Sequence, residues 1–118
     1  MVKNSRFADY SVRVSDEALV VRGGRNRIED IRRGIGTHPS GITGVSVESS
    51  EGVTIVELSR AIPHRQIGVT TVGEIRKIGD VIRTFGRSLY HATLTGLTPE
   101  QISNLLTPMI LNPIRGGK

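Results

Sequence analysis

The chain contains no cysteine and no tryptophan, and two phenylalanines and two tyrosines are the only aromatic residues among its 118. The absence of cysteine excludes a disulfide framework and a thiolate metal site. The three histidines are widely separated and no H-E-x-x-H spacing occurs, so we expect no metal site. We also expect no bound cofactor. The scarcity of aromatic side chains disfavours a surface that binds nucleic acid by stacking on its bases.

Long hydrophobic runs are also missing. The longest span a few residues, such as 18–21, whereas crossing a bilayer takes about 20. The first six residues include the basic Lys3 and Arg6, but no apolar stretch follows them, so we expect no signal peptide here. We expect a soluble protein with no membrane partner that acts in the cytoplasm. The sequence leaves open export by another route.

Positive charge is in excess. Sixteen lysines and arginines stand against eleven acidic residues, giving a net charge of +5, which favours an anionic partner such as nucleic acid. Five arginines fall within twelve residues: Arg22, Arg25, Arg27, Arg32 and Arg33. The planar guanidinium suits phosphate, so this cluster is a candidate phosphate contact. A solvated helix face produces the same pattern, and both interpretations remain open here.

The length is that of one domain. We expect a loose lead-in at 1–9, a globular core at 10–111 and a frayed tail at 112–118. Apolar patterns predict strands at 18–22, 44–48, 67–72, 80–85 and 90–95. Helices are predicted at 27–33 and 53–62, a helical turn at 73–78, a loop at 34–44 and a turn at 49–52. A last helix begins after Thr98 with Pro99 in its first turn and Gln101 completing a capping box, and Pro108 ends it.

Strands and helices do not alternate with the regular spacing of βαβ units. We therefore expect one compact α+β domain with a mainly antiparallel, twisted sheet of about four to five strands and two to three short helices.

The stretch 86–96 carries the most informative pattern. In a strand, alternate side chains point to opposite faces. His91, Thr93 and Thr95 are thus predicted to share one face, and Tyr90, Ala92 and Leu94 the other.

This pattern suggests a proton-transfer site. The charge of an imidazole changes near neutral pH, so His91 can serve as general acid or base, with Thr93 and Thr95 holding substrate. Either Arg83 or Arg87 would stabilise charge on a phosphoryl oxygen. This is a minimal set of groups for cleaving RNA without metal, in which a 2′-hydroxyl attacks the adjacent phosphate.

The two other histidines are secondary candidates. His64 follows Pro63 in a turn and is a candidate second acid or base. His38 lies in a Gly- and Ser-rich loop and is a candidate substrate contact. Residues 91–94 also fit the H-x-T-hydrophobic motif of the two-histidine phosphoesterases, which residues 38–41 match poorly because Gly41 is not hydrophobic.

The small basic α+β module, the stretch 86–95 leading into 97–101, and the ending at 105–108 with Asn112 and Pro113 resemble the C-terminal toxin domains of bacterial polymorphic toxin systems. Many such domains are similar to metal-independent ribonucleases of the barnase, EndoU, colicin and RelE type. The resemblance implies a ribonuclease acting on RNA, with tRNA one substrate, and general roles for His91, Thr93 and Arg87. It also implies an acidic immunity protein as partner and delivery as part of a secreted toxin.

A second resemblance lies in residues 20–24, Val-Val-Arg-Gly-Gly, which are similar to the first strand of arginine-type ADP-ribosyltransferases. There an arginine holds a phosphate of NAD, the role implied for Arg22, and residues 44–50 with Ser46 would form the serine-containing strand. The late E-x-E pair of those enzymes is absent, and Glu57, Glu74 and Glu100 are isolated. A basic module that binds nucleic acid or protein without catalysis is the third alternative.

Overall fold

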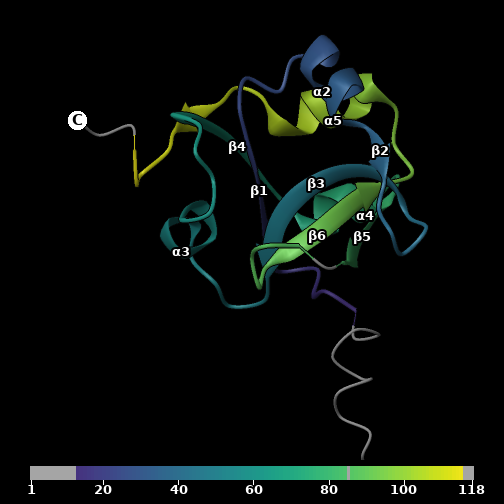
Figure 1. Cartoon of the computed structure of the whole chain (residues 1–118), viewed down its shortest axis with the longest axis horizontal. Helices are drawn as coiled ribbons and strands as arrows, with labels where there is room; N and C mark the ends of the chain where they lie inside the picture. Colours follow the sequence, from purple (N-terminus) through teal and green to yellow (C-terminus); the bar gives the residue numbers. More distant parts are fainter. Residues whose placement is uncertain (1–12, 85, 116–118) are drawn as a thin grey trace, which may run out of the picture.

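A computed structural model describes residues 13–84 and 86–115 of the chain (Figure 1). The predicted lead-in at 1–9 and the end of the predicted tail lie outside the described residues. Within them the elements follow in the order β1 (Leu19–Gly23), α2 (Ile28–Gly34), β2 (Gly36–Thr37), β3 (Thr43–Ser50), α3 (Ile55–Ser59), β4 (Gln66–Thr71), α4 (Val72–Arg76), β5 (Asp80–Arg83), β6 (His91–Thr95), α5 (Pro99–Leu106) and β7 (Ile110–Leu111).

The strands form one antiparallel sheet in the order β5-β6-β3-β1-β4-β7, and β2 pairs with β3 off this path. The α+β class predicted from the sequence is confirmed. The described residues contain more elements than predicted, namely four helices and six strands besides β2. The extra strands β2 and β7 have two residues each, too few for an alternating pattern, and they are strands only because a partner lies beside them.

Three helices begin at a threonine whose hydroxyl accepts a hydrogen bond from the backbone N–H three residues later: Thr54, Thr71 and Thr98. At α5 the predicted capping box is present, because the Gln101 side chain accepts a bond from the Thr98 N–H in return. Thr71 also explains why α4 starts at Val72, one residue before the predicted turn.

Apolar side chains pack on both faces of the sheet. The alternation of Val20 and Val21 in β1 sends one into each of two clusters. On one face α2, α4 and α5 cover residues of β1, β3, β5 and β6 (Figure 1). On the other face α3 covers Val21 and Ile67 of β1 and β4. The continuation of this second face over β3 and β6 carries polar side chains instead.

Several local expectations differ from the structure. The helix predicted at 53–62 spans only Ile55–Ser59, and the loop predicted at 34–44 contains β2 and the start of β3. Ser49 and Ser50, predicted in a turn, extend β3, because β1 pairs with them. Tyr90 packs against the α3 cluster and not with Ala92 on the other face, because β6 begins only at His91 and the Tyr90 N–H donates to the Ser88 hydroxyl in a turn. Asn112, assigned to the tail, is buried, and its Nδ2 donates to two backbone carbonyl oxygens.

Candidate active site

The sheet divides into two halves between β1 and β3. These strands pair only from Leu19 to Val21, which lie opposite Ser50 to Glu48. Beyond that point β1 stays paired with β4, and β3 stays paired with β6. The two halves therefore diverge, as β1 and β3 do in Figure 1.

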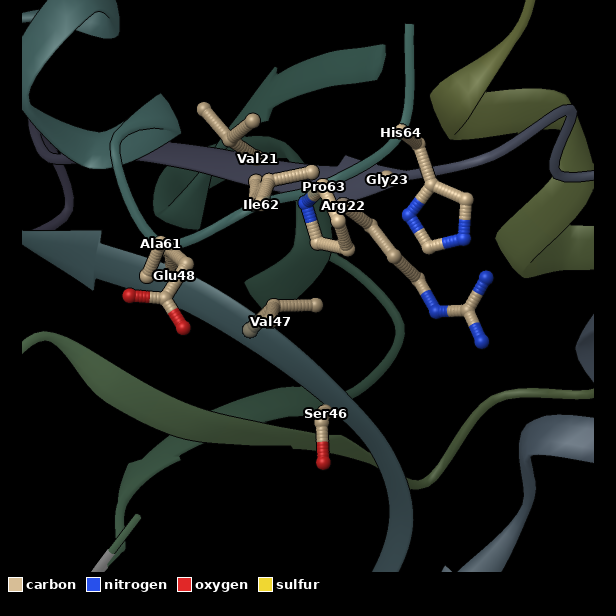
Figure 2. Close-up of a pocket in the computed structure, with 10 residues that line it drawn as sticks. All are labelled: Val21, Arg22, Gly23, Ser46, Val47, Glu48, Ala61, Ile62, Pro63 and His64. Atoms are coloured by element: carbon tan, nitrogen blue, oxygen red, sulfur yellow. The ribbon is translucent and has the colours of Figure 1, made fainter. Parts of the chain in front are cut away.

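A cavity of about 240 Å³ lies where the halves diverge, and we call it the Arg22 cavity. Its lining comes from both halves and from the segment after α3: Val21, Arg22, Gly23, Ser46, Val47, Glu48, Ala61, Ile62, Pro63 and His64 (Figure 2). In that view the side chains of Arg22 and His64 extend toward one end, and the Glu48 carboxylate lies toward the other.

Arg22 is held in place by the turn that follows β1. Its NH1 donates to Oδ1 of Asn26 at 2.8 Å, and its guanidinium lies against Gly34 at the end of α2, where a Cβ would overlap it. Asn26 is fully buried with φ of 57°, and its Nδ2 donates back to the carbonyl oxygens of Arg22 and Gly24. Asparagine tolerates this left-handed conformation better than most residues. The turn thus fixes both ends of the Arg22 side chain.

Burial lowers the pKa of Arg22, and the charge of Asp30 opposes that shift only in part. Its Nε is buried and has no hydrogen-bond partner among the described residues. A buried N–H left unbonded is costly, so this atom favours a ligand that offers an acceptor oxygen.

Glu48 presents a matching unpaired atom. Its Oε1 is buried and accepts no hydrogen bond within 13–84 and 86–115. Burial raises the pKa of Glu48, while a hydrogen bond from Ser88 and the charge of Arg83 act against that rise. The Arg22 cavity therefore has an unmet donor on β1 and an unmet acceptor on β3.

A chain of hydroxyls and an imidazole runs across β3, β6 and the end of β5. His91 Nε2 lies 3.1 Å from Ser46 Oγ, and His91 Nδ1 lies 2.8 Å from Thr84 Oγ1. Thr84 Oγ1 is in turn 3.0 Å from Thr93 Oγ1. With a neutral ring, one consistent assignment has Ser46 donating to Nε2 and Nδ1–H donating to Thr84. His91 is then oriented from both sides, as a catalytic base requires.

The electrostatic surroundings favour the neutral imidazole. Burial lowers the pKa of His91 most, the charges of His38 and Arg83 add to this effect, and the hydrogen bond to the Thr84 backbone opposes it. At neutral pH the ring is therefore available to accept a proton.

His38 is brought beside His91 by the loop between β2 and β3. The two ring centroids are 5.7 Å apart and the planes are tilted by 31°. The His38 Nδ1 accepts a hydrogen bond from the Ser40 backbone N–H at 3.0 Å, which holds the ring in the loop. A second cavity of about 160 Å³, the His38 cavity, is lined by Gly34, Gly36, Thr37, His38, Gly44, Ser46 and Thr93. Ser46 lines both cavities, so they adjoin along β3.

Two predicted site residues use their polar groups inside the sheet. Arg83 donates through NH1 to the His91 carbonyl oxygen and through NH2 to that of Ser49, so it ties β5 to β6 and β3. Thr95 shares the face of His91 and Thr93, as predicted, but its hydroxyl donates to the Thr43 carbonyl oxygen.

The three remaining predicted residues are all exposed. His64 is exposed and lines the Arg22 cavity rather than the histidine pair. Arg25 is exposed beside His64 in a separate hollow. Arg87 is exposed in the connection between β5 and β6. The structure thus joins His91, Thr93 and His38 in one group and Arg22 with His64 in another, and Ser46 links the two.

Sequence reasoning missed Glu48, Thr84 and Asn26 as site residues. The alternation Val45, Ser46, Val47, Glu48 did carry a signal for the first, because it places the serine and the glutamate on one face. Nothing in the sequence marks Thr84, which lies just past the end of β5.

No group of three or more histidine, aspartate or glutamate side chains that could hold a metal ion occurs in the described part of the chain. No helix among the described residues is long and apolar enough to cross a membrane. Comparison with known proteins found no matching family model, no matching curated protein and no matching solved structure.

Proposed function

We propose that the protein binds NAD in the Arg22 cavity and transfers its ADP-ribose to an acceptor. The observation that carries this proposal is that Arg22 and Ser46, from two separate strands, line one cavity together with the half-buried Glu48, whose Oε1 is buried and accepts no hydrogen bond from the described residues. Arg22 and Ser46 are the two residues through which the sequence resembles arginine-type ADP-ribosyltransferases. Those enzymes have a late E-x-E pair that this chain lacks, and in this proposal Glu48 supplies the carboxylate.

The size and chemistry of the cavity suit one end of a dinucleotide. Its volume of about 240 Å³ is below the ~300–1,000 Å³ typical of pockets that enclose a drug-sized ligand. The nicotinamide riboside half fits the Glu48 end of the cavity, and the diphosphate lies at the Arg22 end, where the buried Arg22 Nε offers an unmet donor.

The reaction breaks the bond between nicotinamide N1 and ribose C1′. The bonding electron pair leaves with nicotinamide, and C1′ acquires the positive charge of an oxocarbenium-like transition state. A carboxylate beside such a centre stabilises it, which is the role of Glu48. The acceptor then forms the new bond to C1′ and gives up its proton to His91, either directly or through Ser46.

The test uses the purified chain and NAD, with nicotinamide release followed by chromatography. We expect Arg22→Ala to lower kcat/KM by about 10²- to 10³-fold, mainly through weaker binding of NAD. We expect Glu48→Gln to lower kcat by about 10²-fold while NAD still binds, because the amide keeps the shape but not the charge. Arg32→Ala, which removes an exposed arginine on α2 from its pair with Glu100, is the control and should behave as wild type. Absence of nicotinamide release together with absence of NAD binding at millimolar concentration would overturn the proposal.

A second candidate is the metal-independent ribonuclease expected from the sequence, and the pairing of His38 with His91 favours it. Two imidazoles 5.7 Å apart can act as base and acid on one phosphodiester, with His91 taking the 2′-hydroxyl proton and His38 protonating the leaving oxygen. A hollow of about 560 Å³, bordered by His38, Pro39, Ser40 and Gly86, gives an RNA strand access to the two histidines.

Total RNA and tRNA incubated with the protein and EDTA distinguish the two candidates. Cleavage that is lost in both His38→Ala and His91→Ala, with NAD left intact, would establish the ribonuclease. Intact RNA with NAD consumed would eliminate it.

A further inference from the structure

Six of the thirteen cationic side chains in the described residues have a carboxylate partner. Ion pairs hold Arg27, Arg32, Arg33, Arg60, Arg76 and Lys77. Arg22 and Arg83 are bonded within the fold, as described above. The described cationic side chains outside these two sets are Arg13, Arg25, Arg65, Arg87 and Arg115.

Two of those positions share one hollow. Arg25 and Arg65 are exposed, and their side chains make no ion pair or hydrogen bond within the described residues. Both line a hollow of about 370 Å³, the Arg25 hollow, together with Gly24, His64, Gln66 and Leu111. No acidic residue is part of that lining, so the positive potential is not neutralised from within.

The backbone that carries these side chains is fixed. The Gly24 N–H donates to the Gln66 carbonyl oxygen at 2.9 Å, and the Asn112 N–H donates to that of Arg65 at 2.8 Å. The buried Asn112 side chain also bonds the His64 carbonyl oxygen. Two guanidinium groups are thus presented from a rigid base, which reduces the entropy lost when a ligand binds.

The hollow adjoins the candidate active site, because His64 lines both it and the Arg22 cavity. We propose that the Arg25 hollow binds the phosphodiester backbone of an RNA strand, with Arg25 and Arg65 each contacting a phosphate and Gln66 bonding a ribose hydroxyl. The bound RNA is then also the acceptor of ADP-ribose; this role rests on the proposed function, whereas the binding does not.

RNA suits the hollow better than the diphosphate of NAD does. Arg22 already offers a donor for that diphosphate inside the neighbouring cavity. Two arginines on an open surface instead match the repeated phosphates of a strand, and the net charge of +5 favours a polyanion.

The experiment measures binding of a fluorescent single-stranded RNA 12-mer by anisotropy at several salt concentrations. We expect Arg25→Ala/Arg65→Ala to bind about tenfold more weakly near 0.1 M salt. The log–log salt dependence should become shallower by about 1.4, since each contacted phosphate of a single strand contributes about 0.7. The matched control is Arg32→Ala/Lys77→Ala, which removes the same net charge from α2 and the end of α4 and should bind as wild type. Arg25→Lys/Arg65→Lys should recover most of the salt dependence.

Parallel titrations with NAD and with DNA of the same sequence show which phosphate-containing ligand the hollow binds. If the double alanine variant loses NAD affinity but keeps RNA affinity, the hollow serves the dinucleotide and the inference is wrong. Equal weakening by the two double variants would also overturn it, because binding would then follow net charge alone. RNA binding that depends on the hollow in a protein that leaves NAD intact would support this inference and count against the proposed function.

Discussion

At the scale of single residues, two buried atoms, one buried side chain and one ring decide what the site can do. The Arg22 Nε and the Glu48 Oε1 lack partners among the described residues, whereas the Asn26 side chain bonds Arg22 at both its guanidinium and its carbonyl oxygen. His91, by contrast, has a hydroxyl at each ring nitrogen. The atoms without a hydrogen-bond partner indicate where a ligand would bind, and the groups that have partners hold the site in position.

The lowered pKa of His91 gives a prediction for pH dependence. The ring must be neutral to take a proton, so kcat/KM should rise as pH increases through a midpoint below the ordinary value of about 6.5 and be level by neutral pH. A proton NMR titration of the imidazole should show the same low midpoint. His91→Asn should lose this limb of the profile and keep any limb due to Glu48. A midpoint above 6.5 would contradict the burial that the structure gives the ring.

The same shift has a consequence for stability. Since the folded pKa lies below the unfolded one, the unfolded chain binds more protons between the two values. His91 therefore makes the protein progressively less stable as pH falls from about 6.5 through the folded pKa. Chemical unfolding at pH 7 and near pH 5 should show a smaller loss of stability in His91→Asn than in wild type.

At the scale of elements, glycines allow the strands and loops to approach closely around His91. A Cβ on Gly44 would overlap the Leu94 carbonyl oxygen, so glycine lets β3 lie against β6 at this point. A Cβ on Gly86 would overlap the His91 ring itself. Gly86, in the connection between β5 and β6, thus packs against the imidazole and limits where the ring can lie.

Replacing Gly86 with alanine should move the ring without unfolding the protein, because Gly86 is exposed. We expect Gly86→Ala to lower kcat/KM by about 10²-fold, the cost of roughly 1 Å of misplacement, with little change in Tm. Gly36→Ala is the matched control, since its added Cβ meets no atom within 4 Å. Equal activity of the two variants would mean that the position of His91 is not critical.

At the scale of the whole molecule, the candidate site exists because one sheet divides into two halves. One half, β1-β4-β7, contributes Arg22, and the other, β5-β6-β3, contributes Ser46, Glu48 and His91. Unneutralised positive charge collects beside the opening, at Arg25 and Arg65. An acidic immunity protein, the partner implied by the toxin resemblance, would be complementary in charge to this surface.

If the chain is a toxin domain with the proposed activity, its induced expression in bacteria should arrest growth and lower cellular NAD. Arg22→Ala should relieve both effects, and Arg32→Ala neither. Growth arrest with steady NAD and fragmented tRNA would instead favour the ribonuclease, and normal growth at high expression would argue against a toxin of either kind. Co-expression of an acidic partner that restores growth would identify the inhibitor.

The sequence by itself determined the class of fold, most of its elements and the face of β6 that carries His91, Thr93 and Thr95. Those features follow from local causes: alternation in strands, threonine caps on helices, and proline and glycine at their ends. Only the tertiary structure decided which distant side chains meet. It placed His38, not His64, beside His91, and it committed Arg83 to carbonyl oxygens within the sheet. It also placed Glu48 and Arg22 in the lining of one cavity. The register of β1 against β3 and the point where the two strands separate depend on long-range packing, so no local pattern in the 118 residues predicts them.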